Sequence, residues 1–387
     1  MVEKEIKGIE KSYETRTMIK MEDGMKYEVI YKTSTSFVVE LKENGYFSSE
    51  SEHEIYVNGE LAEKSNRNVA SVFGLQPATT YDVKIAYEGE ETETFPVTTE
   101  EEYVTLNVKD FGAKGDGENN DTACIQCAIN ACPKGGRVYI PAGVYKIYPL
   151  FLKSDLVIEL AKGAVLSAFT DRESFPILPG KIACVNPEKE YLLGTWEGDP
   201  LDMFAAIITG INVENVVITG QGVIDGCASR ENWWHDPKVK RIAWRPRMMF
   251  LNHCKNIVVH GITVQNSPSW NIHPYFSQDL KFIGISVLGP KDSPNTDGLD
   301  PESCKNVDII GVYFSVGDDC IAIKSGKIYM GAKYKTPSEN LTIRQCCMRD
   351  GHGSITIGSE MAGGVKNLNV EECLFLHTDR GLRIKTR

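Results

Sequence analysis

The feature that most constrains the fold of this chain is a repeat in its second half. Six times, an asparagine or aspartate precedes a short run of alternating apolar residues, and the last four intervals are 23, 27, 34 and 27 residues. The repeated positions are Asn215, Asn256, Asp279, Asn306, Asn340 and Asn367. Repeats of this length built from short strands indicate a solenoid, in which each turn buries its inward face only by stacking on its neighbours. We therefore predict an all-β fold, a right-handed parallel β-helix.

The first hundred residues have a different texture. Strand-like segments occur at residues 37–41, 54–57 and 81–85. Asn58-Gly59 closes the second of these as a turn. The run 74–83 resembles the tyrosine corner of fibronectin type III domains, in which a Tyr hydroxyl bonds back to nearby backbone. We predict a small fibronectin type III-like β-sandwich with its linker over residues 1–102, and the β-helix over residues 103–387.

The net charge limits the possible partners of the chain, and its apolar segments bear on its compartment. Lys and Arg number 42 against 53 Asp and Glu, and the net charge of -11 argues against nucleic acid or an anionic membrane as the main partner. No run of about 18 apolar residues occurs, and residues 1–7 lack the apolar segment of a secretory signal. We expect a cytoplasmic protein, with a secreted or periplasmic one as the alternative if a leader was removed.

The cysteines agree with a reducing compartment. Their number, 11, is odd, and they are scattered through the last two thirds of the chain, which favours reduced thiols over a disulfide framework. Cys124 and Cys127 have the spacing of a metal or redox pair. The surrounding segment, 122–131, is a predicted amphipathic helix with Asp121 as its N-cap, so buried structural cysteines are the favoured interpretation.

Four polar motifs stand at intervals comparable to those of the repeat. They are Asn295-Thr296-Asp297, Asp318-Asp319, Gly351-His352-Gly353 and Arg383-Ile384-Lys385. Residues one coil apart in a β-helix lie one above another at about 4.8 Å, so sequence spacing becomes the geometry of a site. Arg383 and Lys385 project to the same side of a strand because side chains alternate. Two positive charges would then lie beside three carboxylates and a histidine.

This set of side chains suits the hydrolysis of a glycosidic bond. That reaction needs one carboxyl group kept protonated, to donate to the leaving oxygen, and another kept ionised, to activate water or attack carbon. Three crowded carboxylates separate their pKa values, because like charges a few ångströms apart cannot all ionise easily. A basic pocket in an acidic protein indicates a uronic acid rather than a neutral sugar.

The four motifs, intact and in order, resemble the hallmark motifs of glycoside hydrolase family 28, the polygalacturonases. The resemblance extends over residues 104–387. It implies inverting hydrolysis of α-1,4-galacturonosidic bonds in polygalacturonate or pectin oligosaccharides, with Asp318 as general acid and Asp297 and Asp319 together positioning and deprotonating the water.

The same resemblance implies the supporting residues of the site. His352 supports the protonated acid, Arg383 and Lys385 bind the galacturonate carboxylate, and Asn295 is a further candidate substrate contact. No metal or other cofactor is implied.

Within the family, the chain resembles most closely the bacterial exo-acting members that carry an N-terminal fibronectin type III-like domain. Exo action needs a closed end to the groove, and we expect the loops 187–202 and 231–247 to close it. Trp234 and Arg245 in the second loop are candidate substrate contacts, with packing inside the loop as an equal alternative for the tryptophan.

The chain ends at Arg387, directly after the last motif, and the tyrosine that the family carries on a later coil is absent. We expect a C-terminally truncated form of a longer protein, because a solenoid ending on this strand would expose its core.

Other interpretations stay open. A rhamnogalacturonan or xylogalacturonan hydrolase would share the acid machinery and differ in its products. A β-helix pectate lyase would release unsaturated products, and the last two motifs argue against it. A non-catalytic pectin-binding protein would bind without turnover.

Overall fold

The computed structural model describes residues 18–20, 26–42, 45–183, 185 and 190–386. Residues 1–7, which bear on the expected compartment, lie outside this part of the chain. The chain divides into two compact units, 1–101 and 102–387, and each has its own hydrophobic core. No helix of the described residues is both long and apolar enough to cross a membrane.

The first unit consists of two antiparallel sheets that share one core. One sheet has the order β1 (Met18–Lys20), β2 (Lys26–Lys32), β3 (Ser36–Lys42) and β6 (Val69–Phe73). The other has the order β5 (Glu60–Arg67), β4 (Ser48–Val57), β7 (Thr80–Tyr87) and β8 (Glu90–Glu91), with β9 (Phe95–Thr98) also paired to β7. Phe37 and Leu41 of the first sheet pack with Ile55 and Val83 of the second.

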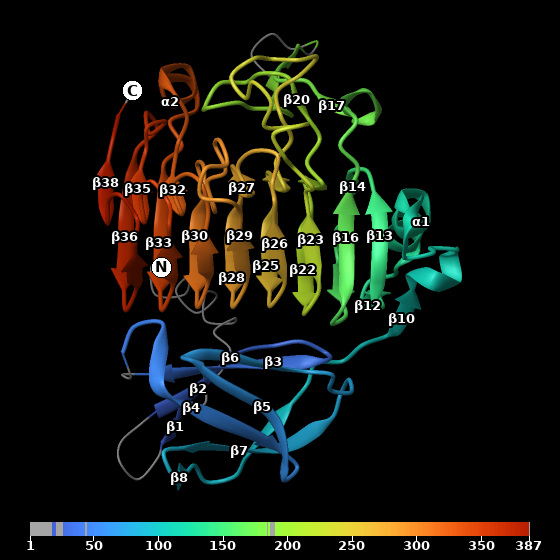
Figure 1. Cartoon of the computed structure of the whole chain (residues 1–387), viewed down its shortest axis with the longest axis vertical. Coiled ribbons are helices and arrows are strands. Elements are labelled where there is room, and N and C mark those ends of the chain that lie inside the picture. Colours follow the sequence, from blue (N-terminus) through green and yellow to red (C-terminus); the bar gives the residue numbers. More distant parts are fainter. Residues whose placement is uncertain (1–17, 21–25, 43–44, 184, 186–189, 387) are drawn as a thin grey trace, which may run out of the picture. The chain divides into compact units, whose positions relative to one another are not determined.

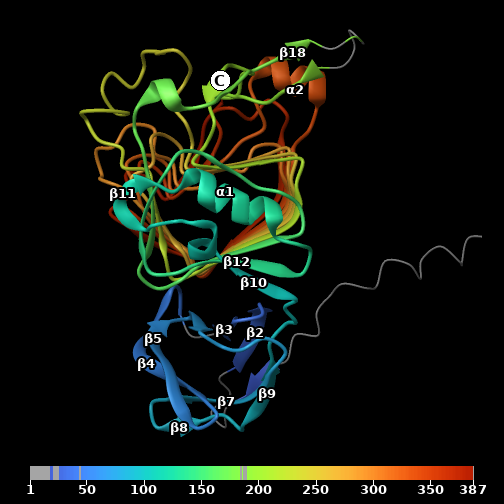
Figure 2. The ribbon, with the colours of Figure 1, turned by 90° about the vertical axis from the view of Figure 1, so that its right-hand side faces the viewer.

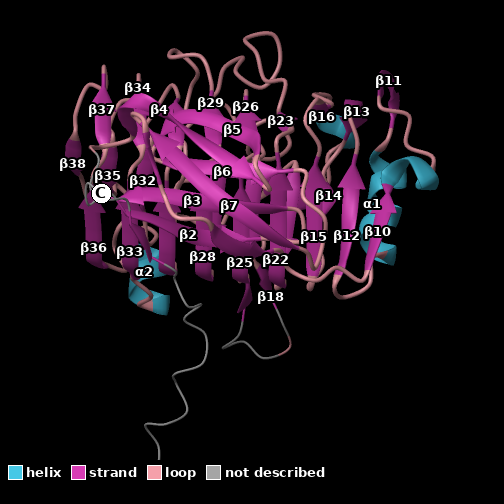
Figure 3. Cartoon of the chain, turned by 90° about the horizontal axis from the view of Figure 1, so that it is seen from below, coloured by secondary structure: helices cyan, strands magenta, loops and turns pink. Residues whose placement is uncertain are grey.

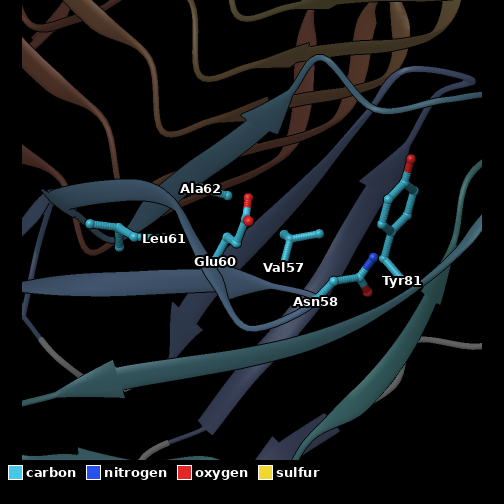
Figure 4. Close-up of a pocket in the computed structure, with 6 residues that line it drawn as sticks. All are labelled: Val57, Asn58, Glu60, Leu61, Ala62 and Tyr81. Carbon is cyan, nitrogen blue, oxygen red and sulfur yellow. The ribbon is translucent and has the colours of Figure 1, made fainter.

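Two details of the first unit bear on its expected fold and role. The Tyr81 hydroxyl accepts a hydrogen bond from the Gln76 backbone N–H at 2.8 Å, the bond expected of a tyrosine corner. A hollow is lined by Val57, Asn58, Glu60, Leu61, Ala62 and Tyr81 (Figure 4). It holds one carboxylate, that of Glu60, and its other titratable group is the Tyr81 phenol. The identity of this unit as a fibronectin type III-like domain stays a prediction.

The second unit is a parallel β-helix, in which three sheets run along the stack of coils (Figures 1 and 3). The first sheet is β10 (Val104–Asn107), β12 (Gly136–Ile140), β15 (Leu156–Leu160), β22 (Glu214–Gly220), β25 (Lys255–His260), β28 (Gln278–Ile283), β30 (Lys305–Ile310), β33 (Ser338–Arg344) and β36 (Val365–Glu371). The second is β11 (Asp116–Asn120), β13 (Gly143–Ile147), β16 (Ala164–Ala168), β23 (Val223–Asp225), β26 (Thr263–Gln265), β29 (Ser286–Leu288), β31 (Tyr313–Ser315), β34 (Cys347–Arg349) and β37 (Leu374–Leu376).

The third sheet carries the motifs and has two segments. These are β14 (Leu150–Phe151), β21 (Ile208–Ile211), β24 (Met249–Asn252) and β27 (Ile272–Tyr275), and then β32 (Ile321–Ile323), β35 (Ile355–Ile357) and β38 (Leu382–Ile384). Single parallel bridges from Ile272 to Leu299 and from Leu299 to Ile321 join the two segments. Residues of successive coils therefore lie in register along one face.

Short elements interrupt or cap the coils. They are the 3-10 turns η2 (Val108–Phe111) and η3 (Arg172–Ser174), the helices α1 (Thr122–Ala131) and α2 (Ile328–Tyr334), and two small antiparallel pairs, β17 (Ile177–Leu178) with β20 (Met203–Phe204) and β18 (Ile182–Ala183) with β19 (Glu190–Tyr191). Helix α1 lies across the first coils (Figure 2) and adds Ile125 and Ile129 to the core of the β-helix.

Two local expectations at α1 are wrong. The Asp121 carboxylate does not cap the helix and instead accepts from the backbone N–H groups of Lys114 and Gly115 at 2.6 and 2.9 Å. Cys127 is exposed rather than buried, although the ten described cysteines are all free. Cys254 and Cys304 are buried within the stack.

The repeat found in the sequence is a ladder of turn residues. All six positions have a left-handed backbone, with φ between 52° and 58°, which Asn and Asp tolerate better than other non-glycine residues. Each asparagine amide donates to the residue one coil earlier at 2.8–3.0 Å, from Asn367 through Asn340 and Asn306 to Asp279, and from Asn256 through Asn215 to Asp155. Both ladders end on an aspartate because a carboxylate accepts but does not donate.

We predict that Asn306→Ala destabilises the β-helix more than Asn306→Gly. Both variants lose two hydrogen bonds, worth about 1 kcal/mol in all at this exposed site, but alanine must also adopt a positive φ at a cost of about 1 kcal/mol. Urea unfolding followed by tryptophan fluorescence measures this, since all five tryptophans lie in the second unit. Equal stabilities of the two variants would show that the left-handed conformation is not limiting.

Candidate active site

Backbone pairing brings the four motifs onto successive coils, as their spacing predicts. The Gly298 N–H donates to the Asp319 carbonyl at 2.9 Å, and the His352 N–H donates to the Asp318 carbonyl at 3.1 Å. One coil further, Arg383 of β38 lies opposite Thr356 of β35. The motif side chains therefore share one outer face of the third sheet.

Asp297, Asp318 and Asp319 form a compact cluster. One oxygen of each lies within 4.8 Å of the others. Asp297 and Asp319 are buried, whereas the Asp318 side chain is 24% exposed. The backbone bends at Gly317 and Asp318, and this bend lets adjacent aspartates serve the same site. Among the described residues no other set of three or more His, Cys, Asp and Glu side chains is arranged to hold a metal ion.

The two basic residues of the last motif face Asp319. Lys385 Nζ donates to Asp319 Oδ2 at 2.8 Å, and an Arg383 guanidinium nitrogen lies 3.7 Å from Asp319 Oδ1. Both basic side chains remain partly exposed. Each has more donors than these contacts use, so an anionic group bound on this face could contact them as well.

His352 lies beside Asp318 at the open side of the cluster. Its Nδ1 is 3.7 Å from Asp318 Oδ1, longer than a hydrogen bond, and its side chain is 57% exposed. Its Nε2 is 3.6 Å from Asp379 Oδ2. Asp379, which follows the third motif by one coil, was not predicted from the sequence.

The surroundings raise the pKa values of two of the three aspartates. Burial and then the charge of Asp319 raise the pKa of Asp318, with His352 opposing. Burial, Asp300 and Asp318 raise the pKa of Asp297 well above its ordinary value. Asp297 and Asp318 can therefore each hold a proton, and Asp318, the more exposed of the two, can donate it to an atom bound beside it, while Asp319 lies against two cations.

Trp234 and Arg245 are not placed for substrate contact. Trp234 is 6% exposed, belongs to the core and donates from Nε1 to the Ser267 carbonyl at 3.1 Å. Arg245 is 3% exposed, and its guanidinium donates to Asn295 Oδ1 at 2.7 Å. These observations contradict the expectation of direct contact and favour packing. Arg245 instead orients the half-buried Asn295.

The first expected blocking loop is tied to α2. Residues 187–189 of that loop lie outside the described part of the chain. The carboxylate of Glu190, in β19, forms ion pairs with Lys181 and Lys333 at 2.6 Å each. It also accepts a hydrogen bond from the Tyr329 hydroxyl at 2.8 Å. Over the outer faces of β24 and β27, the side chains of Leu178, Leu192, Met203 and Met330 cover Phe250 and Tyr275.

A buried set of charges behind the cluster was missed from the sequence. Its members are Arg247, His273, Asp300, Glu302, Lys324 and Glu360. Neither carboxylate oxygen of Asp300 has a hydrogen-bond partner among the described residues. The alternation of side chains along a strand could have indicated one member of this set. Ile321 and Ile323 point into the core, so Ala322 and Lys324 must point to the face that carries the motifs.

Comparisons with known proteins agree with this geometry. The model of "Glycosyl hydrolases family 28" matches residues 186–387, slightly more than half of the chain. A "Rhamnogalacturonase A/epimerase, pectate lyase-like" model matches residues 105–158. The chain belongs to glycoside hydrolase family 28.

Two relatives and two solved structures illustrate the relationship. A probable polygalacturonase of Vitis vinifera is 35% identical over 73% of this chain and 57% of its own length. An endo-polygalacturonase of Pectobacterium carotovorum subsp. carotovorum is 33% identical over 68% and 64%. The exopolygalacturonase structure from Thermotoga maritima has 30% identity and a TM-score of 0.64 over 73% of this chain and 68% of that one. The family 28 exopolygalacturonase structure from Yersinia enterocolitica, at 22% identity, shares the fold with a TM-score of 0.71 over 96% and 76%.

The chain thus spans about 57–64% of the length of the curated relatives it matches. Three aspartates, a histidine and two basic residues of the family's motifs stand together in the fold, and the family is one of glycoside hydrolases.

We predict that Trp234→Ala destabilises the second unit by about 3–5 kcal/mol, because a large buried side chain is removed from the core. His235→Ala, at an exposed neighbouring position, is the matched control and should change stability by less than about 0.5 kcal/mol. Urea unfolding followed by circular dichroism measures both. A Trp234→Ala variant as stable as the parent would make this residue a candidate sugar contact again.

Proposed function

We propose that this chain hydrolyses α-1,4-galacturonosidic bonds of polygalacturonate and its oligosaccharides, with inversion and from a chain end. The observation that carries the proposal is the pairing of unlike carboxyl groups on one face. Asp318, whose pKa is raised, stands beside Asp319, which Lys385 and Arg383 hold at 2.8 and 3.7 Å.

Each side chain takes a role that its surroundings support. Asp318 is the general acid, because it is the most exposed of the three aspartates and can keep a proton for the glycosidic oxygen. Asp319, beside two cations, and Asp297, whose charge Lys324 favours against its acidic neighbours, position the water and receive its proton. His352 borders the acid, and the spare donors of Arg383 and Lys385 bind the uronate carboxylate, since guanidinium and ammonium groups recognise carboxylates by charge-assisted hydrogen bonds.

The choice of substrate rests on charge and on relatives. A neutral sugar would gain little from two cations in the groove, whereas a galacturonate residue carries the complementary charge. The curated relatives from Vitis and Pectobacterium bear the name polygalacturonase, and the solved structures bear the name exopolygalacturonase.

Exo action is proposed from the covered face of the third sheet. The segment that carries Leu178, Leu192 and Met203 lies with α2 over β24 and β27, and Glu190 fastens this segment to α2. A polymer lying along the face would meet this wall on the coil directly before Asp297, because β27 pairs with the coil of Leu299. The endo-polygalacturonase name of one relative makes the mode of action a question for experiment.

We predict that products of exo action appear from the start of the reaction. Chromatography of polygalacturonate and short oligogalacturonide digests should show monomer or dimer alone at early times. Asp318→Asn should lower kcat by about 10²–10⁴-fold with KM nearly unchanged, since the shape is kept and only the proton donor is lost. Asp308→Asn, in β30 of the first sheet, is the matched control.

Other product patterns contradict specific parts of the proposal. An early ladder of oligomers means endo action and an open groove. Unsaturated products mean elimination. Binding of the oligosaccharide without turnover means a binding protein, and cleavage of only xylogalacturonan or rhamnogalacturonan means a related hydrolase.

We predict that the first product has the β configuration at its new reducing end. The nearest oxygens of the three aspartates lie within 4.8 Å, which is shorter than the roughly 6.5–9.5 Å usual for inverting enzymes with two carboxylates, so geometry alone does not favour inversion. Inversion is proposed from the family and from two aspartates that share one water. Proton NMR of the anomeric signals during the first minutes decides, because an initial α anomer would mean retention.

A further inference from the structure

Lys324 is a buried cation behind the aspartate cluster that the proposed function does not use. Its residue is 2% exposed, and its ammonium nitrogen lies 3.0 Å from Glu360 Oε2 and 3.8 Å from Asp297 Oδ2. The same nitrogen lies over the Trp270 ring, 4.4 Å from its centroid. A buried ammonium group requires such partners, because an unpaired charge in the interior is very costly.

Backbone pairing between adjacent coils places Lys324 next to Glu360. Lys324 follows β32 and is bridged to Glu302 of the preceding coil. The Ser325 N–H donates to the Glu360 carbonyl at 2.6 Å, and Gly326 is bridged to Met361. The Ser359 hydroxyl donates to Glu360 Oε1 at 2.7 Å. The second oxygen of Glu360 is thereby directed at the ammonium group.

Charges around this pair come from several coils. Asp297 is faced by Asp300, Asp318, Asp319, Lys324, Arg245 and Arg247. Lys324 is faced by Glu360, Asp300, Asp297 and Glu302. Arg247 also lies near Asp300 and Glu302. Burial disfavours the ammonium, but Glu360, Asp300 and Asp297 more than offset it, so the pKa of Lys324 is raised. Burial disfavours the Glu360 carboxylate, but Lys324 and Ser359 lower its pKa to about 2. Both partners are therefore charged at neutral pH.

We propose that Lys324 is a positioning residue that favours the ionised form of the Asp297 carboxyl for its part in activating the water, and that Glu360 holds the ammonium group 3.8 Å from Asp297. The inference rests on the proposed hydrolytic function. Asp297 is surrounded by carboxylates that disfavour its charge, and Lys324 is the cation that lies within 4 Å of it in the described structure. Without that cation, the ionised form of Asp297 would be disfavoured further, and a smaller fraction of the enzyme could take a proton from water.

Two substitutions should move the pH profile in opposite directions. Activity that needs ionised Asp297 rises with pH through the pKa of this group. Lys324→Met removes the cation, so the acid limb of kcat should shift upward by about one pH unit or more. Glu360→Gln removes the competing carboxylate and leaves Asp297 as the nearest acidic neighbour of the ammonium group, so the acid limb should shift downward. Lys281→Met, in β28 of the first sheet, is the matched control and should leave the profile unchanged.

The pH profiles of kcat, measured with the whole chain acting on short oligogalacturonides, test the positioning role of Lys324 separately from the proposed hydrolytic function. Opposite shifts support the positioning role. A Lys324→Met variant that folds and keeps its acid limb would overturn it, even if kcat falls, because a purely structural role lowers activity at all pH values.

A second measurement does not depend on hydrolysis. If the parent chain degrades no galacturonide, the proposed function fails, and the contact is tested by urea unfolding of Lys324→Met in the parent and in an Asp297→Asn background. A smaller destabilisation in the Asp297→Asn background supports the coupling of Lys324 to Asp297. Equal destabilisation in both backgrounds overturns it.

Discussion

The register between successive coils is the constraint on which the rest of the second unit depends. Each coil must hydrogen-bond to its neighbours, so the strand-to-strand spacing of about 4.8 Å becomes the spacing of the site. Asp297, Asp319 and Gly353 come from three successive coils, which are held in register because the N–H groups of Gly298 and Cys320 donate to the coils after them. Gly353 shows how close this packing is, since a Cβ there would lie 2.8 Å from Asp319 Oδ1.

Crowding on this face gives carboxyl groups with different tasks. Charges in a place with little water interact strongly, and a carboxylate without a cation tends to take up a proton. Asp319 has Lys385 and Arg383 close by, whereas Asp318 has His352 at 3.7 Å. In the proposed reaction, the distribution of cations among the three aspartates therefore assigns the donor and the acceptor of the proton.

Repetition made the solenoid and its shared face predictable from the sequence, whereas contacts between distant segments were not predictable. The recurring asparagines identify the solenoid because each must occupy the same left-handed turn, and the motif spacing identifies the shared face. The same spacing does not tell whether a loop side chain is buried: Trp234 packs in the core and Arg245 orients Asn295. The position of Asp121 in the sequence is typical of a helix cap, but its carboxylate accepts hydrogen bonds from the backbone N–H groups of Lys114 and Gly115 instead.

Buried charges were the hardest part to foresee, because their partners are distant in sequence. Lys324 and Glu360 are separated by a helix and three strands, and nothing in the local composition marks them as a pair. Alternation places Lys324 on the motif face, where only carboxylates or water can compensate its charge. A lysine at a strand position that must be buried therefore requires a carboxylate one coil away. Applied to this chain, that requirement points to Glu360, and through it to the segment after the third motif as part of the site.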